Sequence, residues 1–173
     1  MSDPISLPAP TMIQTKIGQL AVRDTGRTPA GGEILVLWPA IFADHTIYRA
    51  QIAAWVKCHR LVVIDGPGHG DSGPAPGPFT MAHCGRAVAQ ILDALAISGP
   101  VAIVGTSFGG LVGGGIRACL PGAHAGRGDA QHAGARVATG LWRPIHRLGC
   151  AAAAPDGRIR PRHCKILLPA GNY

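Results

Sequence analysis

The sequence lacks the features that would place it in a membrane, outside the cell or around a metal ion. Its longest apolar run near the start of the core, 34–43, is interrupted by Pro39 and covers about half of the roughly 20 residues that a membrane-spanning helix needs. The first residues have neither a basic start nor an apolar block ending in small residues, so no secretory signal is visible. The cysteines form no CxxC pair and have no metal-finger spacing. We therefore expect a cytoplasmic protein without a membrane span, a metal ion or a cofactor.

Charged residues are scarce, at 14%, whereas 47% of the 173 residues are apolar, a composition that can bury a core. The net charge of +7 is unevenly distributed along the chain. Residues 1–113 contain seven Lys and Arg and seven Asp and Glu, whereas residues 114–173 contain nine basic residues and only Asp129 and Asp156 as acids. Basic segments can bind phosphate, but aromatic side chains are nearly absent from this one, so we expect no nucleic-acid partner.

The C-terminal third also lacks several residue types. From Ile116 onward there is no Ser, Glu, Phe or Met, and 40 of the 58 residues are Ala, Gly, Arg, Pro, His or Cys. Neither a helical nor a strand period extends beyond a few positions, and only 166–168 suggests a strand. We expect an irregular segment, either disordered or frameshifted. A change of reading frame near residues 113–116 of a GC-rich gene would produce this composition, and a divergent extension is the alternative.

The sequence before this segment has the pattern of an α/β fold. After a loose N-terminus at 1–11, two short strands surround Gly18 and predict an antiparallel hairpin. Continuous apolar runs at 33–38, 60–65 and 101–104 predict buried central strands, and amphipathic helices that begin near Asp44 and Thr80 separate them. This alternation predicts a parallel sheet with right-handed crossovers over 12–113, followed by a basic tail without clear fold at 114–173.

Ser107 lies in a Gly-x-Ser-x-Gly pattern directly after the third central strand. Glycines at 105 and 109 allow a sharp strand-to-helix turn that holds the serine oxygen clear of the backbone, and a helix that begins at 110 would direct its N-terminal amides toward an anion. A glycine-rich structural turn is the alternative interpretation. An oxyanion hole in this arrangement takes one N–H from the residue after the nucleophile, Phe108, and another from the loop after the first central strand, 38–45.

Three motifs follow one another along the chain: the strand and loop at 34–44, which contain Pro39-Ala40, an Asp-x-Pro-Gly-His-Gly-x-Ser loop at 65–72, and the turn around Ser107 at 105–110. In order and spacing they resemble the α/β-hydrolase family, in particular its serine-nucleophile esterase and lactonase branch. In many members a His-Gly pair stands in the place of Pro39-Ala40, and the segment matching 105–110 is the nucleophile elbow. The resemblance covers residues 12–113. It implies that Ile41 donates the second oxyanion N–H, that Gly105 and Gly109 are the elbow glycines, and that Asp65 and His69 are mainly architectural.

The same resemblance leaves the rest of the catalytic triad unassigned. In this fold the acid and then the histidine follow the nucleophile. Downstream of Ser107 the sequence has two acids and four histidines, and none follows an apolar run that could be the required strand: Asp129, Asp156, His124, His132, His146 and His163. We assign no acid and no base. His45 is the better pocket candidate, and we expect His59 and His83 to be solvated.

Serine at position 107, rather than aspartate, implies an acyl-enzyme ester, so we expect hydrolysis of a small ester or lactone and not halide displacement or epoxide opening. The alternative is a truncated or frameshifted hydrolase fragment that lacks the acid and histidine and has little or no activity. The sequence fixes neither the substrate, nor a lid domain, nor the oligomeric state.

Overall fold

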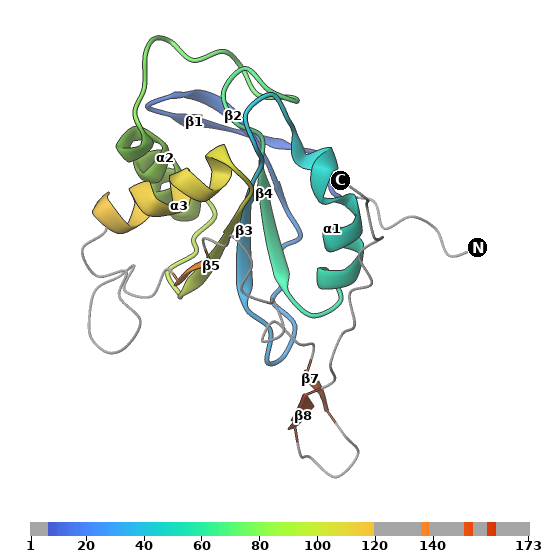
Figure 1. The fold of residues 1–173 in the computed structure, drawn as a ribbon. Helices are drawn as coiled ribbons and strands as arrows, with labels where there is room; N and C mark the ends of the chain where they lie inside the picture. The colour runs from blue at the N-terminus through green and yellow to red at the C-terminus, as the bar shows by residue number, and fades with distance from the viewer. Residues whose placement is uncertain (1–6, 120–135, 139–150, 154–158, 162–173) are drawn as a thin grey trace, which may run out of the picture.

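The computed structural model describes residues 7–119, 136–138, 151–153 and 159–161 (Figure 1). Its main feature is a six-stranded sheet with the strand order β1-β2-β4-β3-β5-β6. The strands are β1 (Thr11–Thr15), β2 (Gly18–Asp24), β3 (Ile34–Trp38), β4 (Arg60–Ile64), β5 (Val101–Gly105) and β6 (Arg136–Ala138). The helices are η1 (His45–Tyr48), α1 (Arg49–Trp55), α2 (Met81–Ala94) and α3 (Phe108–Cys119).

Strand β3 lies between two parallel neighbours, and this arrangement fixes the register of the sheet. Leu35 is opposite Leu61 of β4 on one side and Ala102 of β5 on the other. The first two strands form an antiparallel hairpin, and β2 pairs with β4 in antiparallel fashion. The predicted hairpin followed by parallel strands and crossover helices is therefore confirmed. The carboxyl ends of β3, β4 and β5 lie along one edge of the sheet.

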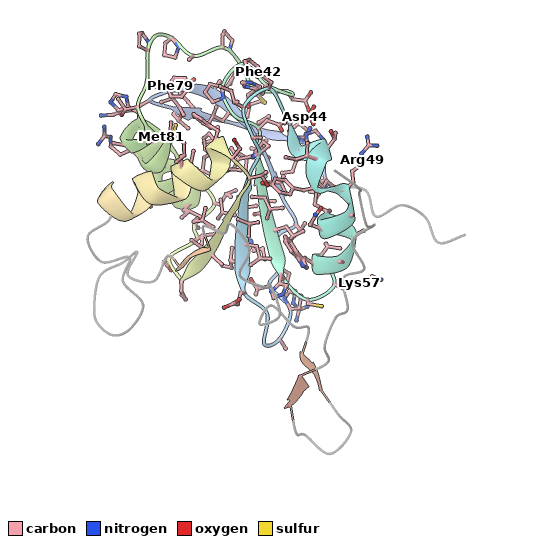
Figure 2. All side chains as sticks on the ribbon, viewed as in Figure 1. Phe42, Asp44, Arg49, Lys57, Phe79 and Met81 are labelled. Carbon is pink, nitrogen blue, oxygen red and sulfur yellow. The ribbon has the colours of Figure 1, made fainter. Side chains whose placement is uncertain are left out.

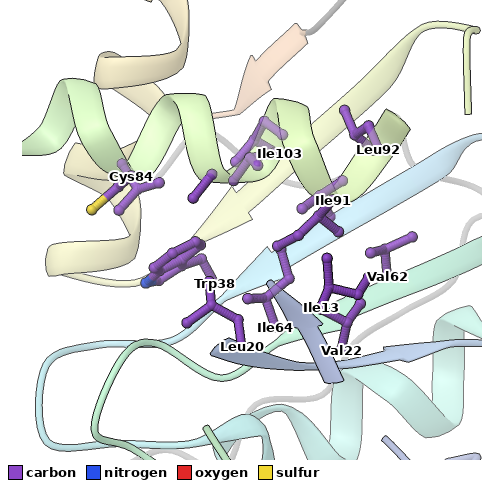
Figure 3. Packing of buried hydrophobic residues seen from close by; sticks show 14 of the residues in the cluster. Ile13, Leu20, Val22, Trp38, Val62, Ile64, Cys84, Ile91, Leu92 and Ile103 are labelled. Carbon is purple, nitrogen blue, oxygen red and sulfur yellow. The ribbon is translucent and has the colours of Figure 1, made fainter. Parts of the chain in front are cut away.

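Helices cover both faces of the sheet, which explains why the central strands are apolar throughout. On one face, alternate residues of β3 and β4, including Val36 and Val62, pack under α2 and α3. Figure 3 shows Ile91 and Leu92 of α2 above the strands on this face. On the other face the intervening residues pack against α1, for example Leu37. Burying a side chain of this size contributes about 1.5–3 kcal/mol.

Both predicted helix starts are confirmed. Asp44 caps η1 by accepting a hydrogen bond from the Thr46 N–H. Thr80 caps α2, and a reciprocal bond between its N–H and the His83 side chain completes a capping box. These caps satisfy amide groups that the first turn of a helix leaves without partners.

Helix α3 continues through Cys119, beyond the composition change near Gly113. Further along the chain, β6 pairs in parallel with β5, and the short strands β7 (Ala151–Ala153) and β8 (Ile159–Pro161) form a separate antiparallel pair. The strand suggested at 166–168 lies outside the described residues. In the part of the chain that the structure describes, no helix is both long and apolar enough to cross a membrane.

Candidate active site

The candidate site lies where β3, β4 and β5 end. Parallel strands bring their carboxyl ends to the same edge of the sheet, and the loops after these strands commonly form ligand sites. An open pocket at this edge is lined mainly by apolar groups from all three loops: Trp38, Pro39, Ala40, Ile41, Ala43, Gly66, Pro67, His69, Phe79 and Phe108. Figure 2 shows Phe42 and Phe79 at this end of the sheet and Lys57 at the opposite end.

Ser107 lies in the turn between β5 and α3, and its backbone has the unusual geometry that such a turn requires. Its φ is +53°, in the left-handed region that a residue other than glycine seldom adopts. The Gly109 N–H donates to the Thr106 carbonyl at 3.0 Å, and the Gly110 N–H donates to the Ser107 carbonyl at 2.9 Å. The turn is therefore closed by its own backbone, and the Ser107 side chain is exposed to solvent.

The two glycines of the turn are required by close backbone contacts. A Cβ atom on Gly105 would overlap the backbone of Gly109, and a Cβ atom on Gly109 would overlap the carbonyl oxygen of Trp38. The contact between Gly109 and Trp38 shows that the turn packs directly against the end of β3. It places Phe108 beside the loop that follows β3, since both contribute to the pocket lining.

An oxyanion donor must be an N–H group that no other acceptor occupies. Among the described residues, the backbone N–H groups of Phe108 and Ile41 meet this condition. Phe108 is the first residue of α3, and a helix leaves its first N–H groups without intrahelical partners. In the loop after β3, the Ala43 N–H donates to the Ala40 carbonyl and the Phe42 N–H donates to the His69 ring. Among the described residues the Ile41 N–H has no hydrogen-bond partner, and the Ile41 side chain is 50% exposed. The structure therefore brings both predicted donors to one pocket.

Tyr48 anchors the loop after β3, and sequence analysis did not identify this role. Its hydroxyl donates to the Trp38 carbonyl at 2.8 Å, so it holds the end of β3 close to the Ser107 turn. Burial raises the pKa of the Tyr48 hydroxyl, and hydrogen bonding with Thr106 opposes that rise. Tyr48 is buried in the core, but the sequence carries no signal that its hydroxyl reaches a strand end.

Asp65 connects several segments beneath the site. Its fully buried carboxylate accepts hydrogen bonds from Arg23 at 3.0 Å, from the His45 N–H at 2.7 Å and from the Asp71 N–H at 3.3 Å. The His45 ring nitrogen Nδ1 also lies 3.1 Å from both carboxylate oxygens. These contacts agree with an architectural role for Asp65. They also direct His45 toward Asp65, and His45 is not part of the pocket lining.

His69 lines the pocket as well as bracing the loop that contains it. Its Nε2 accepts a hydrogen bond from the Phe42 N–H at 2.9 Å, and its Nδ1 lies 2.9 Å from the Pro67 carbonyl. The expectation that His59 is solvated is wrong, because His59 is only 4% exposed and accepts a hydrogen bond from the Glu33 N–H.

The partners that would activate Ser107 are not among the described side chains. Within that part of the chain the hydrogen bonds of Ser107 are those of its backbone carbonyl and none is made by its hydroxyl, and no group of three or more His, Cys, Asp or Glu residues could hold a metal ion. All the acids and histidines that follow Ser107 lie outside the described residues: Asp129, Asp156, His124, His132, His146 and His163. No triad acid or base is therefore assigned from the geometry.

Cys84 is not a competing nucleophile. It is a free cysteine, fully buried on the inner side of α2, and burial raises the pKa of its thiol to about 11. Because the thiolate is the reactive form, this thiol is inert near neutral pH.

Comparisons with known proteins agree with this arrangement. A family model described as alpha/beta hydrolase fold matches residues 33–114. A thermophilic esterase from Thermogutta terrifontis is 28% identical with a TM-score of 0.56, over 64% of this chain and 41% of that chain. The N-acyl homoserine lactonase AidH is 25% identical with a TM-score of 0.58, over 67% of this chain and 42% of that chain.

A hydrolase from Pseudomonas aeruginosa PA01 is 30% identical with a TM-score of 0.54, over 70% of this chain and 43% of that chain. The chain thus spans about two fifths of the length of these solved structures. No curated protein sequence matches it.

Proposed function

Because residues 33–114 of this chain belong to the α/β-hydrolase family, we propose that Ser107 is the nucleophile of a serine hydrolase that acts on a small ester or lactone. The observation that carries the proposal is the backbone of the Ser107 turn. An exposed serine with a φ of +53° stands between a strand end and a helix N-terminus, beside an apolar pocket. A structural turn does not need an exposed serine in this strained conformation.

The proposed reaction begins when the Ser107 Oγ attacks the carbonyl carbon of the substrate. A base takes the serine proton, and the negative charge that develops on the carbonyl oxygen is stabilised by the N–H groups of Phe108 and Ile41. The bond between the carbonyl carbon and the leaving oxygen breaks as the protonated base returns its proton to that oxygen, so an ester releases its alcohol and a lactone ring opens to a hydroxyacyl group on Ser107. Water then attacks the Ser107 ester, which releases the carboxylic acid and restores the hydroxyl.

The pocket and the similar proteins support the proposed substrate class. The lining is dominated by apolar side chains such as Trp38, Phe79 and Phe108, and it suits an uncharged acyl group. Two of the similar structures are described as an esterase and an N-acyl homoserine lactonase. We propose no cofactor and no nucleic-acid partner, and a cytoplasmic location stays a prediction from the sequence.

A fluorophosphonate probe tests the nucleophile directly, because it forms a covalent bond with an activated serine. We expect the purified chain to be labelled at Ser107, as located by peptide mass spectrometry, and Ser107→Ala to remain unlabelled. Ser72→Ala is the matched control, because Ser72 lies on the neighbouring loop, where its hydroxyl donates to the Asp65 carbonyl. A folded sample that the probe does not label would refute the proposal.

The second candidate is an inactive hydrolase fragment. It is favoured by the change of composition near residues 113–116 and by the absence of an assigned acid and base among the described residues. For this candidate we propose that the reading frame changes near residues 113–116. Translating the nucleotide sequence with the frame shifted by one base after the Gly113 codon tests that idea, and it fails if no strand carrying an acid emerges. A folded chain that neither reacts with the probe nor hydrolyses p-nitrophenyl esters would favour the fragment.

A further inference from the structure

The ring of His69 joins the loop after β3 to the loop after β4, and its two hydrogen bonds determine where its proton lies. The Pro67 carbonyl can only accept, so Nδ1 must carry a hydrogen, and the distance between these two atoms is 2.9 Å. The Phe42 N–H can only donate, so Nε2, which lies 2.9 Å from the Phe42 nitrogen, must be unprotonated. Both contacts can therefore exist only with a neutral His69 in the Nδ1–H form.

The backbone at Phe42 depends on this contact. Its φ is +63°, which is costly for a bulky residue. The Phe42 side chain is 89% exposed, so burial of the side chain does not hold the residue in place. Its ring has only a tilted contact with His69, with ring centroids 6.2 Å apart. Two hydrogen bonds therefore restrain the peptide unit next to Ile41: the bond from the Ala43 N–H to the Ala40 carbonyl, which closes the turn, and the bond from the Phe42 N–H to His69, which is the one that ties the turn to another segment.

We propose that His69 is a positioning residue, which holds the Ile41 N–H in the orientation for an oxyanion only while its Nε2 is unprotonated. If Nε2 carried a proton, the His69 Nε2–H and the Phe42 N–H would be two donors facing each other, and the hydrogen bond between them would break. The strained backbone would then relax, and the second oxyanion donor would be displaced. Reactivity at Ser107 should therefore fall as His69 takes up a proton. This last consequence rests on the proposed function, whereas the coupling of His69 to Phe42 does not.

Other ionisable groups lie on the segments around His69, but each of them binds a partner other than His69. They are Arg23 on β2, Asp44 and His45 after β3, Asp65 at the end of β4, and Asp71 on the same loop as His69. Asp65 binds Arg23 and His45, and Asp44 binds Thr46. Among the described residues, none of these side chains hydrogen-bonds to the His69 ring. Protonation of His69 is therefore the direct way to break its bond with Phe42.

Nuclear magnetic resonance tests the coupling without any catalysis. In the Ser107→Ala chain, we expect the Phe42 amide resonance to move with the same midpoint pH as the His69 ring. We also expect amide hydrogen exchange at Phe42 to become faster below that midpoint. A Phe42 amide that stays unchanged while the His69 ring titrates would overturn the proposal.

Two substitutions test the roles of the two ring nitrogens of His69 separately. His69→Gln places an amide oxygen near the Nε2 position and keeps an acceptor for the Phe42 N–H without a titrating group. His69→Asn keeps a donor near the Nδ1 position, for the Pro67 carbonyl, but provides no acceptor for Phe42. We expect the Phe42 amide to be independent of pH in His69→Gln and to exchange rapidly at every pH in His69→Asn. If either variant fails to fold, the titration of the Ser107→Ala chain still decides.

Labelling by the fluorophosphonate probe then measures the effect on reactivity. The unidentified base also loses its function when protonated, so His69→Gln is the reference, and it should show a shallower fall in labelling rate toward low pH than the wild type. His69→Asn should be labelled about tenfold to a hundredfold more slowly at all pH values, as expected for a misplaced oxyanion donor. Equal labelling rates for His69→Asn and His69→Gln would overturn the positioning role. If the wild type is not labelled at any pH, the proposed function is refuted instead. The nuclear magnetic resonance data still decide whether the Phe42 amide is coupled to protonation of His69.

Discussion

The turn that carries Ser107 and the loop that carries Ile41 meet at one pocket, but different forces hold them. Close backbone contacts that tolerate only glycine fix the turn, at Gly105 and Gly109. Hydrogen bonds from side chains on other segments fix the loop, and the bond from Phe42 to His69 is one of them. The first kind of support depends on backbone shape, both within the turn and against Trp38 at the end of β3. The second kind depends on hydrogen-bonding side chains, some of them ionisable, so it responds to mutation and pH in a different way.

The largest loss of stability should come from the buried ion pair beneath the loop. Arg23→Met would leave the fully buried Asp65 carboxylate without its guanidinium partner and would also break the Arg23 pair with Asp71, and we expect a loss of about 3–5 kcal/mol in the free energy of unfolding. Arg60→Met is the control. It breaks a more exposed pair with Asp24, in which the two side chains are 18% and 16% exposed, and should cost only about 1 kcal/mol. Urea denaturation measures both, and equal losses would show that burial of Asp65 does not set the cost.

Gly109→Ala tests the support of the turn. Its Cβ would overlap the Trp38 carbonyl, so either the turn or the end of β3 must move, and we expect a loss of about 3 kcal/mol. Gly110→Ala is the matched control, because a Cβ at that position meets only the Gly105 carbonyl oxygen at 3.6 Å. Within a helix, that substitution should instead stabilise by up to about 1 kcal/mol. Thermal unfolding of the two variants checks the difference, and similar stabilities would contradict the close-contact explanation.

This contrast also explains what the sequence could predict. The elbow follows from a local pattern, because Ser107 stands between glycines directly after a continuous apolar strand. Local signals likewise predict the hairpin, the central strands and the starts of both helices. In contrast, the bond between Tyr48 and the Trp38 carbonyl, the proton position on His69 and the burial of His59 depend on contacts between distant segments. Periodicity indicates which side of a helix is buried, but not which polar atom a side chain reaches.

Tyr48→Phe tests a smaller part of the support of the loop. The substitution removes the hydroxyl that donates to the Trp38 carbonyl at 2.8 Å and keeps the buried ring, so we expect a loss of about 1 kcal/mol. Ile47→Val, at a position where the side chain is 43% exposed, should have little effect. Chemical denaturation measures both changes. A Tyr48→Phe variant as stable as the wild type would mean that the hydroxyl does not hold the strand end.

The smallest effect on stability should come from Asp44, the cap of η1. Its dependence on pH distinguishes support by side-chain hydrogen bonds from support by glycine contacts. The Thr46 hydroxyl and N–H both donate to the Asp44 carboxylate, at 2.6 and 2.8 Å, and these bonds lower the pKa of Asp44. Because the folded pKa lies below that of an unfolded aspartate, the carboxylate stabilises the fold above the usual aspartate range. That contribution is lost as the pH falls through the folded pKa.

Asp44→Asn keeps a capping side chain but removes the charge. We expect the wild type to be more stable than Asp44→Asn by about 0.5 kcal/mol at neutral pH and the two to converge in acid. Thermal unfolding at pH 7 and pH 3 measures this difference, and a gap that does not change with pH would mean that the charge of Asp44 contributes nothing. The glycine contacts of the Ser107 turn contain no titrating group. Repeating the comparison of Gly109→Ala with Gly110→Ala at both pH values should therefore give the same difference, which would show that the support of the turn, unlike the cap at Asp44, does not respond to acid.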